Sequence, residues 1–156
     1  MLRGLTRARV RFVVVGGVAA TAHGATYVTN ELDVCYDAAE SNVERLAALL
    51  AGWKAYPRGI EPGLPFFMDA RTFRTTPVLT LQTTEGAIDS LDRVDGVGHY
   101  AAVRAHAERF EAFETRFWVL GLSALIAAKR AAGRPKDLAQ LPELEALLAL
   151  REAGEA

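Results

Sequence analysis

The stretches FVVVGG at residues 12–17 and ELDVCY at residues 31–36 decide the fold. The first lies in an apolar, β-branched run that predicts a strand over residues 10–15, buried on both faces. Gly16 and Gly17 end that strand, and a short helix is expected over residues 18–23. Residues 32–36 then form a second strand. The predicted unit is therefore strand, glycine pair, helix and strand.

Two acidic residues open the second strand. Because side chains alternate along a strand, Glu31 and Asp33 point to the same face, roughly 6–7 Å apart at their Cα atoms. Paired carboxylates suit hard divalent cations that also contact a triphosphate, and Gly16 and Gly17 leave the backbone open to phosphate oxygens. The combination predicts a site for a nucleoside triphosphate with Mg²⁺. Taken singly, the glycines are typical of a tight turn and the acids of a solvated strand face.

The rest of the chain alternates helices with strands. A helix is expected over residues 42–53, capped by Ser41 or Asn42, followed by a proline- and glycine-rich loop over 56–65. The remaining expected elements are a short strand within 66–73, a hairpin of strands 78–82 and 87–91, a helix over 100–113, a strand over 117–120, a helix over 123–132 capped by Ser123 and stopped by Gly133, and further helix opened at Pro135 and again at Pro142.

This order predicts an α/β (α+β) fold in which helices flank a mixed β-sheet. We expect a core over residues 1–121, with C-terminal helices over 122–156 packed on it as a single compact unit.

The composition of the chain argues against several classes of protein. The chain has 156 residues, of which 51% are hydrophobic, and a formal charge of −1, which disfavours a disordered chain and a strongly basic nucleic-acid protein. A single cysteine excludes an internal disulfide and a cysteine-rich zinc site and suits a reducing cytoplasm. The apolar run before Gly16 is too short for a signal peptide or a membrane span, so no membrane partner is expected.

The strand, glycine pair and acidic strand together resemble the signature of the DNA polymerase β-like nucleotidyltransferase superfamily. Further segments are similar to its small bacterial branch, which is related to AbiEii-type toxins and to minimal nucleotidyltransferases of toxin–antitoxin pairs. The segments that carry this likeness are His23-Gly24, Thr29-Asn30-Glu31-Leu32-Asp33-Val34-Cys35-Tyr36, and the run LIAAKRAAGRPKD at residues 125–137.

The resemblance implies an enzyme that moves a nucleoside monophosphate from a nucleoside triphosphate to a hydroxyl acceptor, which is a protein, a tRNA or a small molecule. It implies Mg²⁺ or Mn²⁺ held by Glu31, Asp33 and a third carboxylate on a later strand. Asp89 is our choice for that third ligand, with Asp92 and Asp95 as rivals and an edge-strand solubility role as the simpler interpretation. The implied partners are the triphosphate, an acceptor protein or RNA, and a cognate toxin or antitoxin or a second copy of the chain.

Four cations fall within eight residues near the C-terminus: Lys129, Arg130, Arg134 and Lys136. Positive charge at the end of a helix is their simpler role. The more specific alternative is that they bind phosphate groups. We assign nucleotide binding to Lys129, Arg134 and Lys136, and we expect Asp137 to orient Lys129 or Lys136. By the resemblance, Gly16 and Gly17 would complete the phosphate contacts.

Two alternatives stay open. A dinucleotide-binding Rossmann unit begins in the same way, but the run after Gly16 lacks the G-x-G-x-x-G spacing. The second is a catalytically inactive member that binds nucleotide or a partner protein. Glu31 favours it, because the family usually places the shorter Asp at this position.

Overall fold

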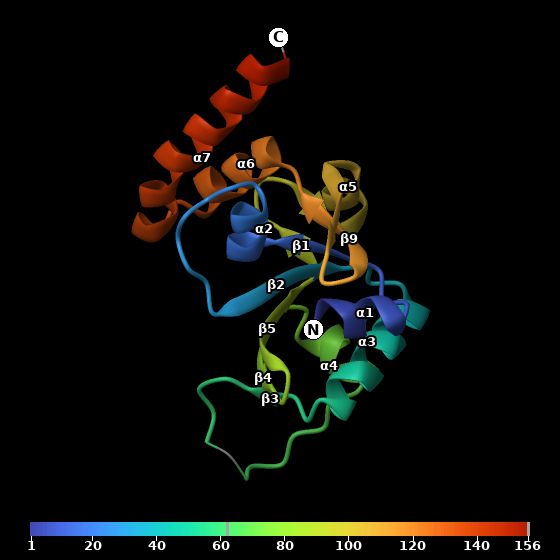
Figure 1. Ribbon diagram of the computed structural model, residues 1–156. Helices are drawn as coiled ribbons and strands as arrows, with labels where there is room; N and C mark the ends of the chain where they lie inside the picture. The colour runs from blue at the N-terminus through green and yellow to red at the C-terminus, as the bar shows by residue number, and fades with distance from the viewer. Residues whose placement is uncertain (62, 156) are drawn as a thin grey trace.

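The computed structural model describes residues 1–61 and 63–155. Its main feature is a seven-stranded mixed sheet with the strand order β3-β4-β5-β2-β1-β9-β8 (Figure 1). The strands of this sheet are β1 (Phe12–Val15), β2 (Glu31–Tyr36), β3 (Tyr56–Pro57), β4 (Leu79–Thr83), β5 (Gly86–Leu91), β8 (Ala107–Ala112) and β9 (Thr115–Leu120). A separate two-stranded ribbon pairs β6 (Arg93–Val94) with β7 (Gly98–His99).

The central strands are the two predicted around the glycine pair. β1 runs antiparallel to β2, with Val15 opposite Asp33, and all four β1 residues are buried. On its other side β2 runs parallel to β5, with Asp33 opposite Asp89. The hairpin expected over residues 78–91 is present as β4 and β5. The acids of β2 therefore lie at the centre of the sheet.

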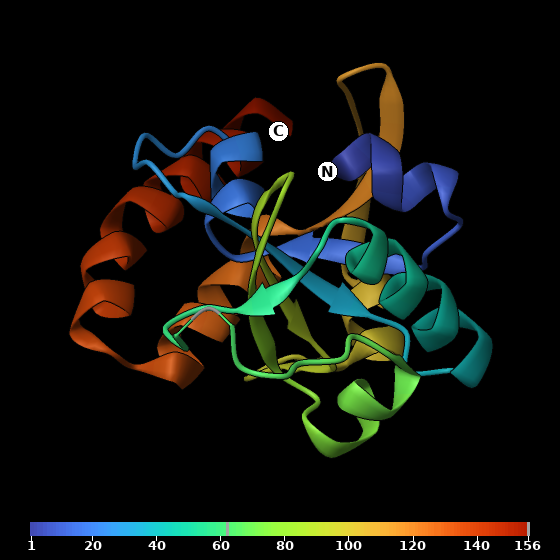
Figure 2. The ribbon, with the colours of Figure 1, turned by 90° about the horizontal axis from the view of Figure 1, so that it is seen from below.

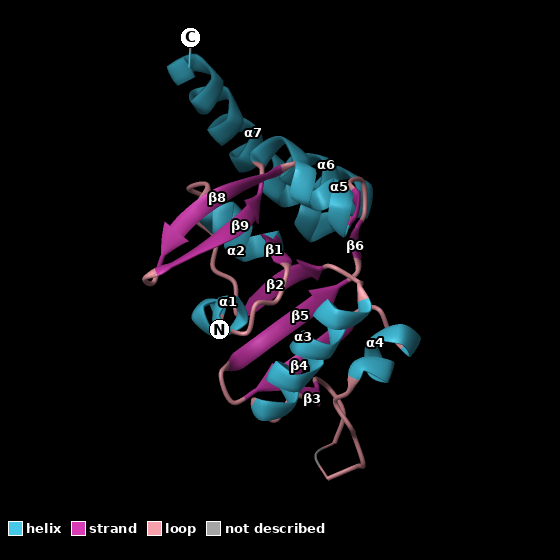
Figure 3. Ribbon diagram, turned by 90° about the vertical axis from the view of Figure 1, so that its right-hand side faces the viewer, coloured by secondary structure: helices cyan, strands magenta, loops and turns pink. Residues whose placement is uncertain are grey.

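Helices cover the sheet from two sides. The helices are α1 (Leu2–Arg7), α2 (Gly16–Ala22), α3 (Glu40–Gly52), α4 (Ala70–Thr75), α5 (Tyr100–Ala105), α6 (Leu122–Ala132) and α7 (Pro135–Glu155). Figure 2 shows α3 and α7 on opposite sides of β1 and β2, and Figure 3 shows α1, α3 and α4 gathered apart from α5, α6 and α7. The main core joins the sheet to α1, α3 and α6, and a smaller apolar cluster joins α2, α6 and α7. No helix of the described chain is long and apolar enough to span a bilayer.

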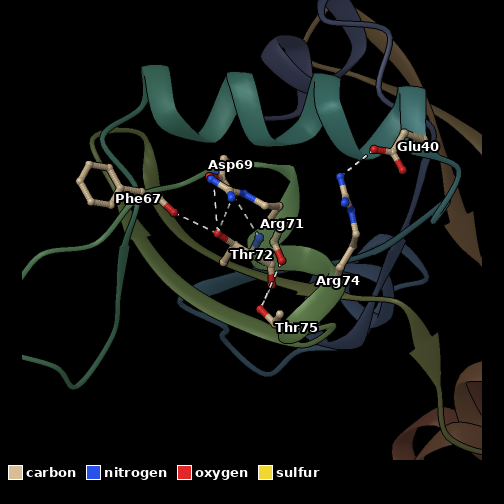
Figure 4. Close-up of polar contacts among 7 residues, drawn as sticks. All are labelled: Glu40, Phe67, Asp69, Arg71, Thr72, Arg74 and Thr75. Carbon is tan, nitrogen blue, oxygen red and sulfur yellow. Dashed lines mark hydrogen bonds and ion pairs between the residues drawn. The ribbon is translucent and has the colours of Figure 1, made fainter.

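The short strand predicted within residues 66–73 is wrong, because most of α4 lies there. Asp69 caps this helix: its carboxylate accepts a hydrogen bond from the backbone N–H of Thr72, whose side chain faces the Asp69 backbone in return (Figure 4). Phe73, the apolar residue that favoured a strand, is instead the buried residue of the helix. Reciprocal capping stabilises a helix too short to persist alone.

The helix predicted over residues 100–113 is also wrong beyond Ala105. Residues 107–112 form β8, which pairs antiparallel with β9. Phe113 and Glu114 make the connecting turn with φ values of 53° and 60°. Neither is glycine or asparagine, so the usual signal for this turn is missing, and pairing with β9 overrides the helical preference of the segment.

Four predicted helix starts differ from the structure. Helix α2 begins at Gly16, two residues before the predicted start at residue 18. Helix α3 begins at Glu40, and Asn42 is buried, where its side-chain amide bonds the backbone of Arg11 and Asp37 instead of capping. Ser123 lies inside α6, whose N-cap is Gly121. Pro142 lies inside α7 rather than opening a helix. The predicted stop at Gly133 is confirmed, with φ of 63°.

Candidate functional site

Gly16 and Gly17 are the first two residues of α2, directly after β1, and neighbouring side chains fill the space that a Cβ atom would need at each of them. Gly16 has φ of +63°, and a Cβ atom there would overlap the carboxylate of Asp33. A Cβ atom on Gly17 would lie 2.8 Å from Cβ of Thr29. Both distances are too short for a side chain at either position. Any residue other than glycine would therefore require Asp33 or Thr29 to shift. Gly16 also lines the cavity described below.

Asp33 and Asp89 form a carboxylate pair across two neighbouring strands. They are register partners in β2 and β5, so both side chains leave the same face of the sheet. The pKa of Asp33 is raised to about 7, mainly by burial. The charge of Asp89, its hydrogen bond with Asp33 and the charge of Glu31 raise this pKa further, whereas the charge of Lys129 lowers it. The pair therefore stores electrostatic repulsion that a cation would relieve.

Glu31 lies on the same face of β2 as Asp33, because the two residues are separated by one position in the strand. It lies opposite Ala87 at the start of β2, two residues before Asp33. Its charge reaches Asp33, but residues 1–61 and 63–155 contain no group of three or more His, Cys, Asp or Glu placed to hold a metal ion. Asp33 and Asp89 would fit a divalent cation as a site with two carboxylate oxygen donors.

Arg58 is the site residue that sequence reasoning missed. It follows β3, inside the segment expected to be a loop, and its guanidinium forms an ion pair with Oδ1 of Asp89. The pairing of Tyr56 and Pro57 with β4 brings it there, because β4 is the neighbour of β5. No periodic pattern in the sequence marks a strand of two residues, so no local signal could have found this contact.

The cation cluster divides into two groups. Asp137, whose side chain is only 1% exposed, accepts a hydrogen bond of 2.6 Å from Nε of Arg134, and Nζ of Lys129 lies 3.4 Å from its other oxygen. Burial raises the pKa of Asp137, but the hydrogen bonds and charge of Arg134, aided by Lys129, outweigh it and hold that pKa below its ordinary value. Arg130 is paired with Glu145 on α7, and Lys136 is exposed.

A cavity of about 370 Å³ joins the first of these groups to Asp33. Its polar lining includes Asp33, Lys129 and Arg134, and Asp137 closes it from α7. The apolar part of its lining consists of Val15, Val78, Leu91, Val94, Leu120, Leu125, Ala128 and Ala132. A cavity with a charged side and an apolar side can hold a ligand that carries both phosphates and a flat ring system.

Asp92 and Asp95, the two alternatives to Asp89 as third ligand, line different cavities. Asp95 is exposed and lines the same cavity as Asp33. Asp92 lines a different cavity, with Tyr36, Val43 and Phe73, on the side of α3 and α4. Asp92 therefore faces away from Asp89, as the alternation of the strand predicts.

Comparison with known proteins supports the fold. By sequence, the chain matches no protein-family profile and no curated protein. By structure, it is similar to a protein of Thermotoga maritima described as a "putative nucleotidyltransferase", with a TM-score of 0.53 and 15% sequence identity over 91% of this chain and 90% of that one. The fold is therefore nucleotidyltransferase-like, as the resemblance implied.

Proposed function

We propose that this chain is a metal-dependent nucleotidyltransferase that moves a nucleoside monophosphate from a nucleoside triphosphate to a hydroxyl acceptor. The observation that carries the proposal is that Gly16, Asp33, Lys129 and Arg134 line one cavity, and that Asp89 is the register partner of Asp33 on the neighbouring strand. The likeness to a solved nucleotidyltransferase-like fold supports the general activity.

The proposed division of roles follows the charges. Lys129 and Arg134 would hold the phosphates, and the buried carboxylate of Asp137 would keep both cations in place. Gly16 and Gly17 would let phosphate oxygens reach the backbone at the start of α2. The apolar lining of the cavity would receive the base.

Asp33 and Asp89 would hold Mg²⁺ or Mn²⁺. When bound, such a cation neutralises charge on the phosphates and lowers the pKa of an acceptor hydroxyl. In the reaction, the hydroxyl oxygen forms a bond to the α-phosphorus while the bond from that phosphorus to pyrophosphate breaks, and the hydroxyl proton is released.

The acceptor is a protein, an RNA such as tRNA, or a small molecule, and the setting that we propose is a cytoplasmic toxin–antitoxin pair. A cognate partner or a second copy of the chain would then contribute to acceptor binding.

A catalytically inactive, nucleotide-binding protein is the second candidate. Two observations favour it: Glu31 does not join Asp33 and Asp89 in a three-ligand group, and Arg58 is paired with Asp89. Such a protein would bind a triphosphate, or a partner protein, without turnover.

A transfer assay distinguishes the two. The chain is incubated with each α-labelled nucleoside triphosphate, Mg²⁺ or Mn²⁺, and cell extract, and label is followed into the protein, RNA and small-molecule fractions. Transfer should fall by several orders of magnitude in Asp33→Asn. Nucleotide binding without transfer in the unaltered chain would support the inactive protein, and unaltered transfer in Asp33→Asn would sink the proposed mechanism.

A further inference from the structure

Arg58 is attached to the candidate site by three contacts. Its backbone N–H donates to the carbonyl of Thr80 at 2.9 Å. Its Nη1 donates to the carbonyl of Leu81 at 2.9 Å, and its Nη2 forms the ion pair with Asp89 Oδ1. The main-chain contact fixes where the residue lies, so the side chain alone decides whether the guanidinium stays on Asp89.

The ion pair is partly withdrawn from solvent. The side chain of Arg58 is 27% exposed and that of Asp89 is 23% exposed, which makes the interaction less screened than a surface salt bridge. Arg58 offsets part of the repulsion between Asp89 and Asp33. Arg58 thus supplies a positive partner to a site of two carboxylates.

A divalent cation and this guanidinium would compete for the same carboxylate. A cation held between Asp33 and Asp89 would bind Asp89 through the carboxylate that Arg58 now contacts, and two positive charges side by side repel each other. Free cation therefore has to displace Arg58 without offering it a new partner. A cation that arrives with a triphosphate brings phosphate oxygens, which are good bidentate partners for a guanidinium.

We propose that Arg58 is a specificity-determining residue that pairs with Asp89 in the cation-free chain and transfers to the phosphates when a cation–triphosphate complex binds. The site then favours the complex over the free cation. This inference rests on the proposed function, because it takes Asp33 and Asp89 as the cation ligands.

The test is calorimetric titration of the full chain with Mn²⁺ alone and with preformed Mn²⁺–ATP, in the absence of any acceptor. Arg58→Gln should bind free Mn²⁺ about tenfold more tightly than the unaltered chain, because it removes the competing charge. It should bind Mn²⁺–ATP no more tightly, because the phosphate contact is lost as well. Arg58→Lys keeps the positive charge but not the planar guanidinium with its several N–H donors. Its affinity for free Mn²⁺ should therefore lie between those of the unaltered chain and Arg58→Gln.

The matched control is Arg74→Gln on α4, which breaks an ion pair of 2.7 Å with Glu40 away from the site (Figure 4). It should leave both affinities unchanged. Equal or weaker binding of free Mn²⁺ by Arg58→Gln would overturn the inference, as would a matching change in Arg74→Gln. If Mn²⁺ binds and Asp33→Asn abolishes that binding while Arg58→Gln has no effect, only the role of Arg58 fails. If Mn²⁺ binds none of the variants or the unaltered chain, the cation site of the proposed function fails too.

Discussion

The carboxylate of Asp33 lies where a side chain on Gly16 would begin. The two residues are far apart in sequence, but Val15 and Asp33 are register partners in β1 and β2, so the turn after β1 faces the acid directly. The glycine is therefore part of the acidic site rather than only a flexible joint. The position of the carboxylate leaves no room for a Cβ atom, and the positive φ is a second, separate reason for glycine at this position.

Gly16→Ala should consequently lower stability and disturb the site at once. The strained φ and the overlap with Asp33 should cost at least about 1–2 kcal/mol of unfolding free energy. Gly52→Ala is the matched control, because Gly52 ends α3 with open space around its Cα and should gain about 0.5–1 kcal/mol. Urea unfolding measures both. Equal stability of the two variants would contradict the packing that we describe.

The stability of the chain should depend on pH through Asp33. Its pKa is about 7 in the folded chain against an ordinary value of 3.8, so the folded state holds more protons between these values than the unfolded state does. Stability should therefore fall as pH rises from about 4 to about 7 and level off above that. Asp33→Asn should remove this slope and be more stable at pH 8, by about 1–3 kcal/mol.

The measurement is unfolding free energy at several pH values between 5 and 8, with and without Mg²⁺–ATP. Taking the difference between the unaltered chain and Asp33→Asn isolates the contribution of Asp33. Mg²⁺–ATP should stabilise the unaltered chain and not the variant. If Asp33 were a structural residue bonded to neighbouring backbone, Asn would destabilise at pH 8 and leave the ligand response intact.

Neighbouring cations should differ in their effect on nucleotide binding. Lys129 lines the cavity, whereas Arg130, the next residue, is paired with Glu145. Lys129→Gln and Arg134→Gln should each weaken ATP binding about tenfold, because each removes a charged hydrogen-bond donor to phosphate. Arg130→Gln should bind as the unaltered chain does. Calorimetric titration with ATP checks this, and equal losses at Lys129 and Arg130 would point to general charge rather than to phosphate binding by particular side chains.

The part of the fold that could be predicted is the part with local signals. A continuous β-branched run that ends in two glycines predicts both β1 and the position where it ends, independently of the rest of the sequence. The opposite case is β8, where alanine, glutamate and arginine favour a helix and only the partner strand β9 makes a strand of them. The sequence of one strand alone does not show which other strand it pairs with.

The same reasoning separates the site residues. Asp33 and Asp89 could be matched because each lies on a strand whose alternation is readable, and they are register partners. Lys129 and Arg134 could be selected only as members of a charged run, and their ion pairs with the buried Asp137 set them apart from the other cations of that run. Arg58 reaches Asp89 through the pairing of two residues with β4, which no sequence window contains.

Glu31 is the residue whose substitution best separates a working enzyme from a decayed one. It begins β2, its charge reaches Asp33, and it stands where the resembling family usually has Asp. If the site is tuned to the longer side chain, Glu31→Asp withdraws the carboxylate by one methylene, so transfer of labelled nucleotide should fall, though less than in Asp33→Asn. Glu31→Gln, which keeps the length and loses the charge, is the matched variant and should fall at least as far. A rise in transfer in Glu31→Asp would mean that the chain has lost an activity that the shorter acid restores.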